Sequence, residues 1–317
     1  MEKGYQRLSL EQLKEWEGLG YGMFIHFGMS TFDGHELSKG DMPSESYCPD
    51  RLDVEQWIRV ARDAGMKYAV LTTKHVSGHC LWPSAYTDYH VGTSSNKTDI
   101  VAEFMKACEK YGIMPGLYYC SWDNHHTFGS LTPSSTQWDW AYTTEEYLQF
   151  QFNQINELLT NYGKIGEVWI DIPKVLPRGY RHKLYNHIAK LQPDAVIMMN
   201  NGIGDGSDLS VANTWPCDLA AIERYLPNSL DGHVQWREIE GKSFYIPGEV
   251  CEPIGREWFY VEGDKPRSDK ELLGMYLISR ARNANLLLDV GPDKHGLIPP
   301  HYVDALMRLR KNIDFFD

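Results

Sequence analysis

The chain has 317 residues, with 31 Lys and Arg against 43 Asp and Glu, so its formal net charge is −12. A surface of this charge repels phosphate backbones and anionic headgroups, which argues against nucleic acid and membranes as partners. Hydrophobic residues at 42% and charged residues at 23% exclude a disordered or fibrous chain. Aromatic residues reach 13%, with 10 Trp and 19 Tyr. Many of these rings must fill the core, but Trp and Tyr at a pocket mouth are also typical stacking surfaces for sugars.

The N-terminus and the cysteines bear on the compartment. Residues 1–8 lack the apolar segment of a signal peptide, and the sequence has no run of 18 apolar residues. The six cysteines are scattered without a C-x-x-C pair, a pattern that indicates free thiols in a reducing compartment. We therefore expect a cytoplasmic protein, with secretion after removal of a leader as the open alternative.

Short apolar runs alternate with longer amphipathic stretches along the chain. The runs predict strands at residues 22–27, 68–73, 113–120, 168–172, 195–200, 243–250 and 286–290, with a further short strand at 210–214. The amphipathic stretches predict helices at residues 53–64, 99–111, 143–162, 179–191, 269–284 and 303–313. Continuous apolar runs are typical of strands that are buried on both faces. Seven or eight such units with right-handed crossovers most simply close into a (β/α)8 barrel, and we expect one barrel domain over residues 1–317.

An open, doubly wound sheet is the alternative architecture. A nucleotide-binding sheet would need a G-x-G-x-x-G sequence at its first strand-to-helix turn. The glycine-rich stretch 202–206 instead follows the fifth predicted strand, where a tight loop is the simpler interpretation. The sequence also lacks a Walker motif, so we expect no nucleotide cofactor.

Polar and aromatic residues gather where the predicted strands end. In a barrel these ends form the active-site mouth, because the loops that follow the strands build it there. The residues at these ends, or in the loops after them, are His26, Glu36, Lys74, His75, His79, Trp82, Tyr118, Tyr119, Trp122, Asp123, Trp169, Asp171, Asn200, Asn201, Glu249 and Trp258. Taken singly, His26 and Trp169 are more typical of a core. A barrel without a catalytic role has little reason to place the whole set at one end.

Two carboxylates in this set indicate chemistry. Asp171 ends an apolar run and is followed by Pro173, so no helix cap explains a buried carboxylate there. Burial of such a group is costly unless the group is paired or used. Glu249 lies at the end of another apolar run. Two carboxylates at a barrel mouth walled by aromatic rings are the minimal apparatus of a glycosidase.

Several motifs, in chain order, resemble the α-L-fucosidases of glycoside hydrolase family 29. They are Phe24-Ile25-His26-Phe27-Gly28, Leu71-Thr72-Thr73-Lys74-His75 with Cys80-Leu81-Trp82-Pro83-Ser84, Val168-Trp169-Ile170-Asp171, Trp258-Phe259-Tyr260, and Arg282-Asn283-Ala284-Asn285-Leu286. The resemblance runs from about residue 21 to residue 306. It implies a catalytic (β/α)8 barrel that hydrolyses terminal α-L-fucosyl residues of oligosaccharides or glycoconjugates with retention of configuration, without a cofactor or metal.

The resemblance also implies residue roles. Asp171 matches the nucleophile, and Glu249 matches the acid/base of many members. Some members take the acid/base from an earlier loop, which leaves Asp205, Asp208, Glu223 and Glu252 as competitors for that role. The positions that match the fucose pocket are His26, Glu36, His75, Tyr119, Trp169 and Trp258.

The chain departs from the family pattern in its pocket and at its end. Val76 stands where a pocket histidine is usual, Ile172 stands where glycine usually follows the nucleophile, and Leu37 replaces a tryptophan. The sequence ends one helix after the last barrel motif, so we expect the barrel without the β-sandwich that usually follows it in the family. We expect a homo-oligomer, in which a neighbouring subunit serves the exposed face and completes the pocket.

Two other functions compete with a fucosidase. Val76 and the open acid assignment suggest a catalytically impaired, fucose-binding pseudoenzyme, although such a protein has little use for a buried Asp171. His75, His79, His125 and His126 suggest a metal-dependent barrel hydrolase. Metal sites in barrels usually carry His-x-His on the first strand, where this chain has only His26, and we therefore expect no metal.

Overall fold

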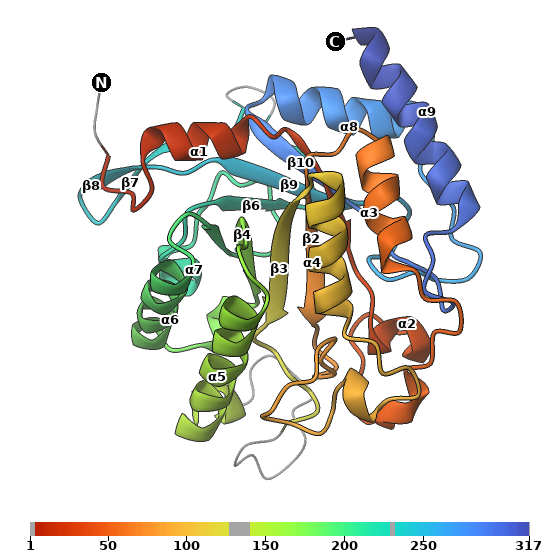
Figure 1. Ribbon diagram of the computed structural model, residues 1–317. Coiled ribbons are helices and arrows are strands. Elements are labelled where there is room, and N and C mark those ends of the chain that lie inside the picture. The colour runs from red at the N-terminus through yellow and green to blue at the C-terminus, as the bar shows by residue number, and fades with distance from the viewer. Residues whose placement is uncertain (1–3, 127–139, 229–231, 317) are drawn as a thin grey trace.

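Eight parallel strands form the centre of the protein in the computed structural model, which describes residues 4–126, 140–228 and 232–316 (Figure 1). They are β1 (Tyr21–Ile25), β2 (Tyr68–Lys74), β3 (Met114–Cys120), β4 (Glu167–Asp171), β5 (Val196–Met199), β6 (Ala220–Glu223), β9 (Gly248–Pro253) and β10 (Ala284–Asp289). The order in the sheet is β5-β4-β3-β2-β1-β10-β9-β6. A single parallel bridge between Met198 and Leu219 links the two edges. The sheet is therefore nearly closed, which confirms the expected (β/α)8 class.

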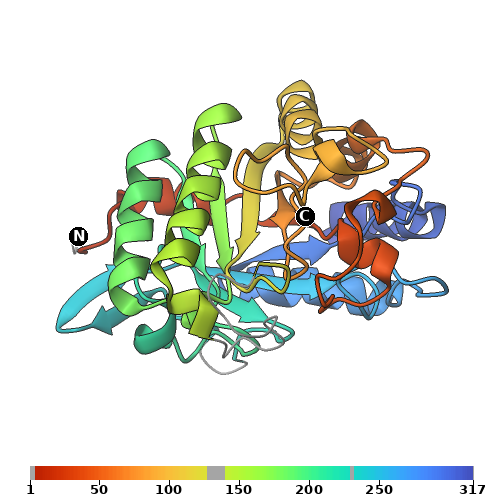
Figure 2. The ribbon, with the colours of Figure 1, turned by 90° about the horizontal axis from the view of Figure 1, so that it is seen from below.

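Helices cover the outside of this sheet. They are α1 (Leu10–Glu17), α2 (Met29–Asp33), α3 (Val54–Asp63), α4 (Ile100–Tyr111), α5 (Glu145–Asn161), α6 (Arg178–Leu191), α7 (Val211–Thr214), α8 (Asp269–Ala281) and α9 (Pro300–Phe316), with short 3-10 turns at Ser44–Ser46, Val91–Thr93, Trp140–Thr143 and Pro173–Val175. In Figure 1, β2 and β3 run downward, and Figure 2 views the molecule from that end. Among the described residues, no helix is long and apolar enough to span a membrane.

Local signals explain where several helices begin. The side chains of Asp53, Asp99 and Ser268 each accept a backbone N–H from the first turn of α3, α4 and α8. Such caps satisfy donors that the helix itself leaves unpaired. Because each of these helices follows a buried strand, the caps also mark where the chain turns from the barrel to its outer layer.

Two predicted strands differ from the structure, and the second difference changes the position of the Glu249 carboxyl group. Residues 210–214 contain the short helix α7, and the sixth barrel strand is instead the four-residue β6. The predicted strand 243–250 spans two elements, β8 (Lys242–Tyr245) and the start of β9. β8 pairs with β7 (Trp236–Ile239) in an antiparallel hairpin outside the barrel. Pro247, which lacks an N–H donor, separates β8 from β9. Glu249 is consequently the second residue of its strand rather than the last.

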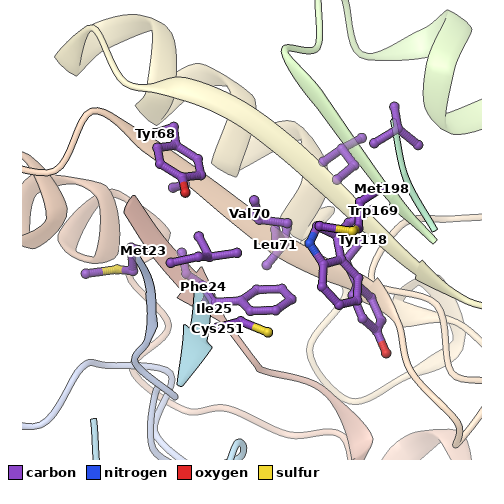
Figure 3. Close-up of a cluster of buried hydrophobic side chains, with 14 of the residues drawn as sticks. Met23, Phe24, Ile25, Tyr68, Val70, Leu71, Tyr118, Trp169, Met198 and Cys251 are labelled. Carbon is purple, nitrogen blue, oxygen red and sulfur yellow. The ribbon is translucent and has the colours of Figure 1, made fainter. Parts of the chain in front are cut away.

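Aromatic side chains fill the part of the barrel interior next to the carboxyl ends of the strands. Figure 3 shows Phe24, Tyr118 and Trp169 together on one side of the buried cluster, with Tyr68 at the other. The ring centre of Phe24 lies 5.3 Å from that of Trp169 and 5.8 Å from that of Tyr118. These three rings belong to the core and also line the pocket at the carboxyl ends of the strands.

Candidate active site

A narrow pocket lies at the carboxyl ends of the barrel strands. It is lined by Phe24, His26, Glu36, His75, Tyr118, Trp169, Asp171, Asn200, Glu223, Cys251 and Trp258. These residues come from strands and loops spread over most of the chain, so only the closed barrel brings them together. The pocket contains six of the eight site residues expected from the sequence. The two that do not line it are Tyr119 and Glu249.

Three hydrogen bonds hold the Asp171 carboxylate at the end of β4. Its Oδ2 accepts the hydroxyl of Tyr118 at 2.6 Å. Its Oδ1 accepts the side-chain amide of Asn200 at 2.8 Å and the backbone N–H of Ile172 at 2.9 Å. The half-buried carboxylate therefore has a defined orientation toward the pocket.

The residue after Asp171 has an unusual backbone. Ile172 lies in the left-handed region, with φ +50° and ψ +44°. This region is strained for a β-branched side chain but open to glycine. The geometry accounts for the glycine that usually occupies this position in the family that the sequence resembles. In this chain the strained backbone carries an isoleucine beside the carboxylate.

Glu223 is the second carboxyl group of the pocket. It ends β6, and its Oε2 accepts the same Asn200 amide nitrogen at 2.9 Å. Burial is the main effect that raises the pKa of Glu223 to about 7, and the negative charge of Asp171 adds to it, while the Asn200 hydrogen bond acts in the opposite direction. Asn200 thus bridges the carboxyl group of Asp171 and that of Glu223, whose pKa is raised to about 7.

Glu249 lies deeper in the barrel than expected. Its Oε1 accepts the hydroxyl of Tyr68 at 2.7 Å, and its Oε2 accepts the indole N–H of Trp169 at 2.9 Å. The side chain is fully buried beside Glu167, and burial raises the pKa of both carboxyl groups. The expected position of Glu249 at the mouth is therefore corrected, because the residue begins β9 instead of ending it.

The other sequence-based candidates for the acid also lie outside the pocket. Asp205 accepts the backbone and hydroxyl of Ser207 within its own loop. Asp205 and Asp208 line a separate hollow. Glu252 forms an ion pair with Arg267 at 3.0 Å. Glu223 is thus the one of these competitors that the structure places in the pocket.

The two pocket histidines are neutral. Burial lowers the pKa of His26 to about 3 and that of His75 well below its ordinary value. The Nδ1 of His26 lies 2.7 Å from an Oδ1 of Asp289, which orients the ring and leaves Nε2 for the pocket. Neutral imidazoles of this kind can exchange hydrogen bonds with sugar hydroxyls.

Stacked rings form the pocket walls. Tyr118 stacks on His75 with ring centres 5.7 Å apart and on Trp169 at 5.5 Å. The ring centres of Trp258 and His26 are 5.2 Å apart. The guanidinium group of Arg224 lies over the Trp258 ring, 4.6 Å from its centre. Such walls suit a ligand with an apolar face.

Tyr119, which was expected in the pocket, points away from it. Its hydroxyl donates to Gln154 on α5 at 2.8 Å, and the Lys74 ammonium lies over its ring at 4.5 Å. Successive residues of a strand face opposite sides, so Tyr118 is the inward residue of this pair. The sequence shows both tyrosines at the end of the same strand, and only the register of Tyr118 with Trp169 on β4 separates them.

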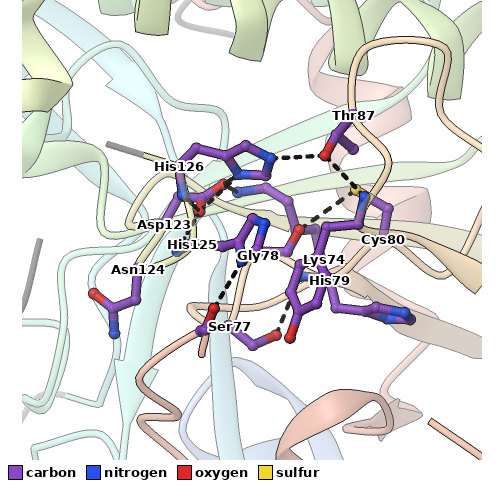
Figure 4. A network of polar contacts seen from close by, with 12 residues as sticks. Lys74, Ser77, Gly78, His79, Cys80, Thr87, Asp123, Asn124, His125 and His126 are labelled. Atoms are coloured by element: carbon purple, nitrogen blue, oxygen red, sulfur yellow. Dashed lines mark hydrogen bonds and ion pairs between the residues drawn. The ribbon is translucent and has the colours of Figure 1, made fainter. Parts of the chain in front are cut away.

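Figure 4 shows a network of polar contacts outside the pocket lining, where Lys74, Asp123 and His126 converge. Lys74 Nζ and Asp123 Oδ2 are 2.8 Å apart, and neither side chain is exposed. His126 Nδ1 lies 2.9 Å from the same carboxylate oxygen. His79 contacts Ser94 at 2.8 Å instead of the pocket. Over the described ranges, no group of three His, Cys, Asp or Glu side chains is arranged to hold a metal ion.

Comparison with known proteins identifies the family. The family model described as Alpha-L-fucosidase matches residues 35–312. Alpha-L-fucosidase 1 of Arabidopsis thaliana is 33% identical, over 94% of this chain and 59% of the plant protein. A putative alpha-L-fucosidase 1 of Oryza sativa is 31% identical, over 92% of this chain and 56% of the relative. The chain thus spans less than two thirds of the length of these relatives.

Solved structures agree with this result. A putative alpha-L-fucosidase from Bacteroides thetaiotaomicron superposes with a TM-score of 0.80 at 30% identity, covering 99% of this chain and 70% of the other. A glycoside hydrolase 29 family member from an unknown rumen bacterium gives a TM-score of 0.78 at 29% identity, covering 96% of this chain and 56% of the other. The chain therefore belongs to the α-L-fucosidase family, glycoside hydrolase family 29.

Proposed function

We propose that this chain is a retaining α-L-fucosidase that hydrolyses terminal α-L-fucosyl residues of oligosaccharides or glycoconjugates. In this proposal Asp171 is the nucleophile and Glu223 is the acid/base. The observation that carries it is the bridge through Asn200, whose single amide nitrogen contacts both carboxyl groups at 2.8 and 2.9 Å. Membership of the α-L-fucosidase family supports fucose as the sugar. The two carboxyl groups in one pocket support hydrolysis of a glycosidic bond.

The bridge also supports retention. Two oxygens that contact one nitrogen at these distances are less than about 6 Å apart. Retaining glycosidases have carboxyl groups separated by roughly 5–5.5 Å, whereas inverting enzymes need roughly 6.5–9.5 Å to fit a water molecule. The spacing therefore suits direct attack by Asp171 on the anomeric carbon.

The pKa of Glu223 suits both of its roles. Burial and the charge of Asp171 raise this pKa to about 7, so the group is largely protonated in slightly acidic solution and can donate to the leaving oxygen. When Asp171 becomes part of the glycosyl ester it loses its negative charge. The pKa of Glu223 then falls, which favours its carboxylate as the base that activates water.

The remaining pocket residues bind the sugar in this proposal. His26, His75 and Glu36 offer polar atoms to the fucose hydroxyls. Trp169 and Trp258 face the apolar side of the ring and its methyl group. We assign Tyr118 to the pocket in place of Tyr119, because Tyr118 contacts the nucleophile directly.

Because both carboxyl groups line one pocket, the fucose-binding pseudoenzyme finds no support in the geometry. Incubation with 4-nitrophenyl α-L-fucoside, followed by proton NMR of the first-formed sugar, tests the proposal. We expect α-L-fucose to appear before its β anomer. Initial release of the β anomer would contradict retention, and a lack of hydrolysis would contradict the enzyme assignment.

The homo-oligomer and the cytoplasmic location expected from the sequence stay predictions. If a neighbouring subunit completes the pocket, specific activity should fall on dilution as the oligomer dissociates. Sedimentation that shows a fully active monomer at assay concentration would contradict this expectation.

A further inference from the structure

A second cavity, of about 510 Å³, adjoins the fucose pocket. The two share Glu36, His75, Asp171, Asn200 and Glu223 as lining residues. In the proposed reaction Glu223 must reach the oxygen that joins fucose to its leaving group. The leaving group therefore extends into the adjoining cavity, and residues that line only this cavity contact it.

Apolar side chains make up five of the ten residues that line only this cavity and not the fucose pocket. They are Leu37, Val76, Trp122, Ile172 and Ile203. Leu37 is 53% exposed and Ile203 is 70% exposed. Three of the five are the positions at which the sequence departs from its family pattern. The departures thus collect in one place, on the leaving-group side of the carboxyl pair.

The backbone ties two of these side chains to the reacting groups. Ile172 directly follows Asp171 and keeps its side chain there despite the strained φ of +50°. Ile203 precedes Gly204, whose N–H and carbonyl both pair with the backbone of Glu223 at 3.1 Å. The backbone of each isoleucine therefore lies beside the backbone of a residue that carries one of the carboxyl groups.

Some polar side chains also line the cavity, namely Lys174, Asn201, Asn213 and Thr214. The amide of Asn201 is engaged in its own loop, donating to Asp208 at 2.7 Å and accepting from Ser210 at 2.9 Å. Asn213 and Lys174 are exposed. The cavity thus combines a polar, solvated rim with apolar walls near the bond that is cleaved.

We propose that this cavity binds an apolar leaving group, an aromatic ring or alkyl chain, in preference to a second hydroxyl-rich sugar. The inference rests on the proposed function and narrows its substrate class to hydrophobic α-L-fucosides. A hydroxyl-rich sugar in this position would leave those of its hydroxyls that face Leu37, Ile172 and Ile203 without partners. An apolar group would instead cover these side chains and remove them from water.

The test compares kcat/KM for benzyl and methyl α-L-fucoside. The two leaving alcohols have similar basicity, so the ratio reports contacts with the leaving group more than the demand for protonation. We expect the wild-type ratio of benzyl to methyl to be roughly tenfold or more. Leu37→Ser and Ile203→Ser should each lower this ratio several-fold. The matched control is Val234→Ser, which removes a similarly exposed apolar side chain from a separate hollow and should leave the ratio unchanged.

The outcomes separate this inference from the proposed function. If both fucosides are hydrolysed with a ratio near one that neither cavity variant changes, the inference is overturned and the fucosidase assignment stands. A higher kcat/KM for fucosyl-α-1,3-N-acetylglucosamine than for the benzyl fucoside overturns it in the same way. If no α-L-fucoside is hydrolysed, including the 4-nitrophenyl substrate, both proposals fall together.

Discussion

The barrel holds one carboxyl pair at its mouth and another near the opposite end of its strands. At the mouth, Asp171 and Glu223 share the amide of Asn200 and face the pocket. These two residues are the mouth pair. At the other end of the barrel, Glu167 and Glu249 are fully buried. They are the lower pair, named for a view with the mouth at the top. Burial raises the pKa of Glu223 and of both residues in the lower pair. A perturbed pKa therefore does not by itself identify the catalytic pair.

The two pairs differ in their hydrogen-bond partners and in their access to the pocket. The lower pair accepts hydrogen bonds from the core side chains of Tyr68, Trp169 and Trp16. One of these, Trp169, is also a pocket wall, so Glu249 contributes to the site only through the ring that it holds. The mouth pair also lines the adjoining cavity, which is open to solvent. We infer that access separates catalytic carboxyls from structural ones in this barrel.

The largest expected effect follows from removal of the proposed nucleophile. Asp171→Asn preserves the shape of the side chain but cannot form the glycosyl ester. We expect kcat to fall by at least about a thousandfold, since removal of a single catalytic group typically costs orders of magnitude in rate. Steady-state kinetics with 4-nitrophenyl α-L-fucoside measures this effect, with thermal unfolding as the control for folding. Near-native turnover would contradict the assignment of the mouth pair.

The lower pair should affect stability instead. Glu249→Ala removes the acceptor of two buried donors, Tyr68 and Trp169, and leaves a cavity. We expect a loss of about 3 kcal/mol in the free energy of unfolding, measured by urea titration. Glu249→Gln keeps the volume and one acceptor, and should lose less. Equal stability of Glu249→Ala and the wild type would show that the lower pair is not structural.

The pH dependence of kcat/KM distinguishes the mouth pair from the lower pair. Glu223 must be protonated to act as the acid, and its pKa is raised to about 7. We therefore expect kcat/KM to decline above about pH 7, approaching tenfold per pH unit at higher pH. Glu249→Gln should keep this alkaline limb, because Glu249 does not line the pocket. An alkaline limb that disappears in Glu249→Gln would reverse the roles of the two residues.

A smaller effect is expected from the pH dependence of stability. Because burial raises the pKa of Glu167 in the folded state, the folded protein binds more protons than the unfolded chain above the ordinary glutamate pKa. Wild-type stability should therefore decrease as the pH rises from about 5 to 8. Glu167→Gln has no proton to release there, so its stability relative to the wild type should improve as the pH rises over this range. Urea unfolding at the two pH values measures it, and a parallel decline in both proteins would contradict the account.

Much of this arrangement could be predicted from the sequence. Short apolar runs predicted seven strands, and the polar and aromatic residues at their ends or in the loops after them led to Asp171, His26 and Trp258. The sixth strand, Ala220–Glu223, is too short and too weakly apolar to distinguish from a loop. Glu223 therefore had no visible strand end and could be named only as a competitor.

The misplacement of Glu249 and Tyr119 has related causes. Residues 243–250 look like one run, and only the barrel pairing shows that β9 starts at Gly248. Strands that are buried on both faces lack the polar and apolar alternation that would tell inward from outward residues. Adjacent tyrosines on β3 were therefore indistinguishable before the register with β4 was known.

Azide rescue tests the central claim most directly, because it reports which carboxyl group faces the reacting sugar. Glu223→Ala and Glu249→Ala are each assayed on 4-nitrophenyl α-L-fucoside with and without sodium azide. We expect azide to accelerate the Glu223 variant and to yield fucosyl azide, while the Glu249 variant gains nothing. Rescue of Glu249→Ala, with none for Glu223→Ala, would contradict the assignment of catalysis to the mouth pair.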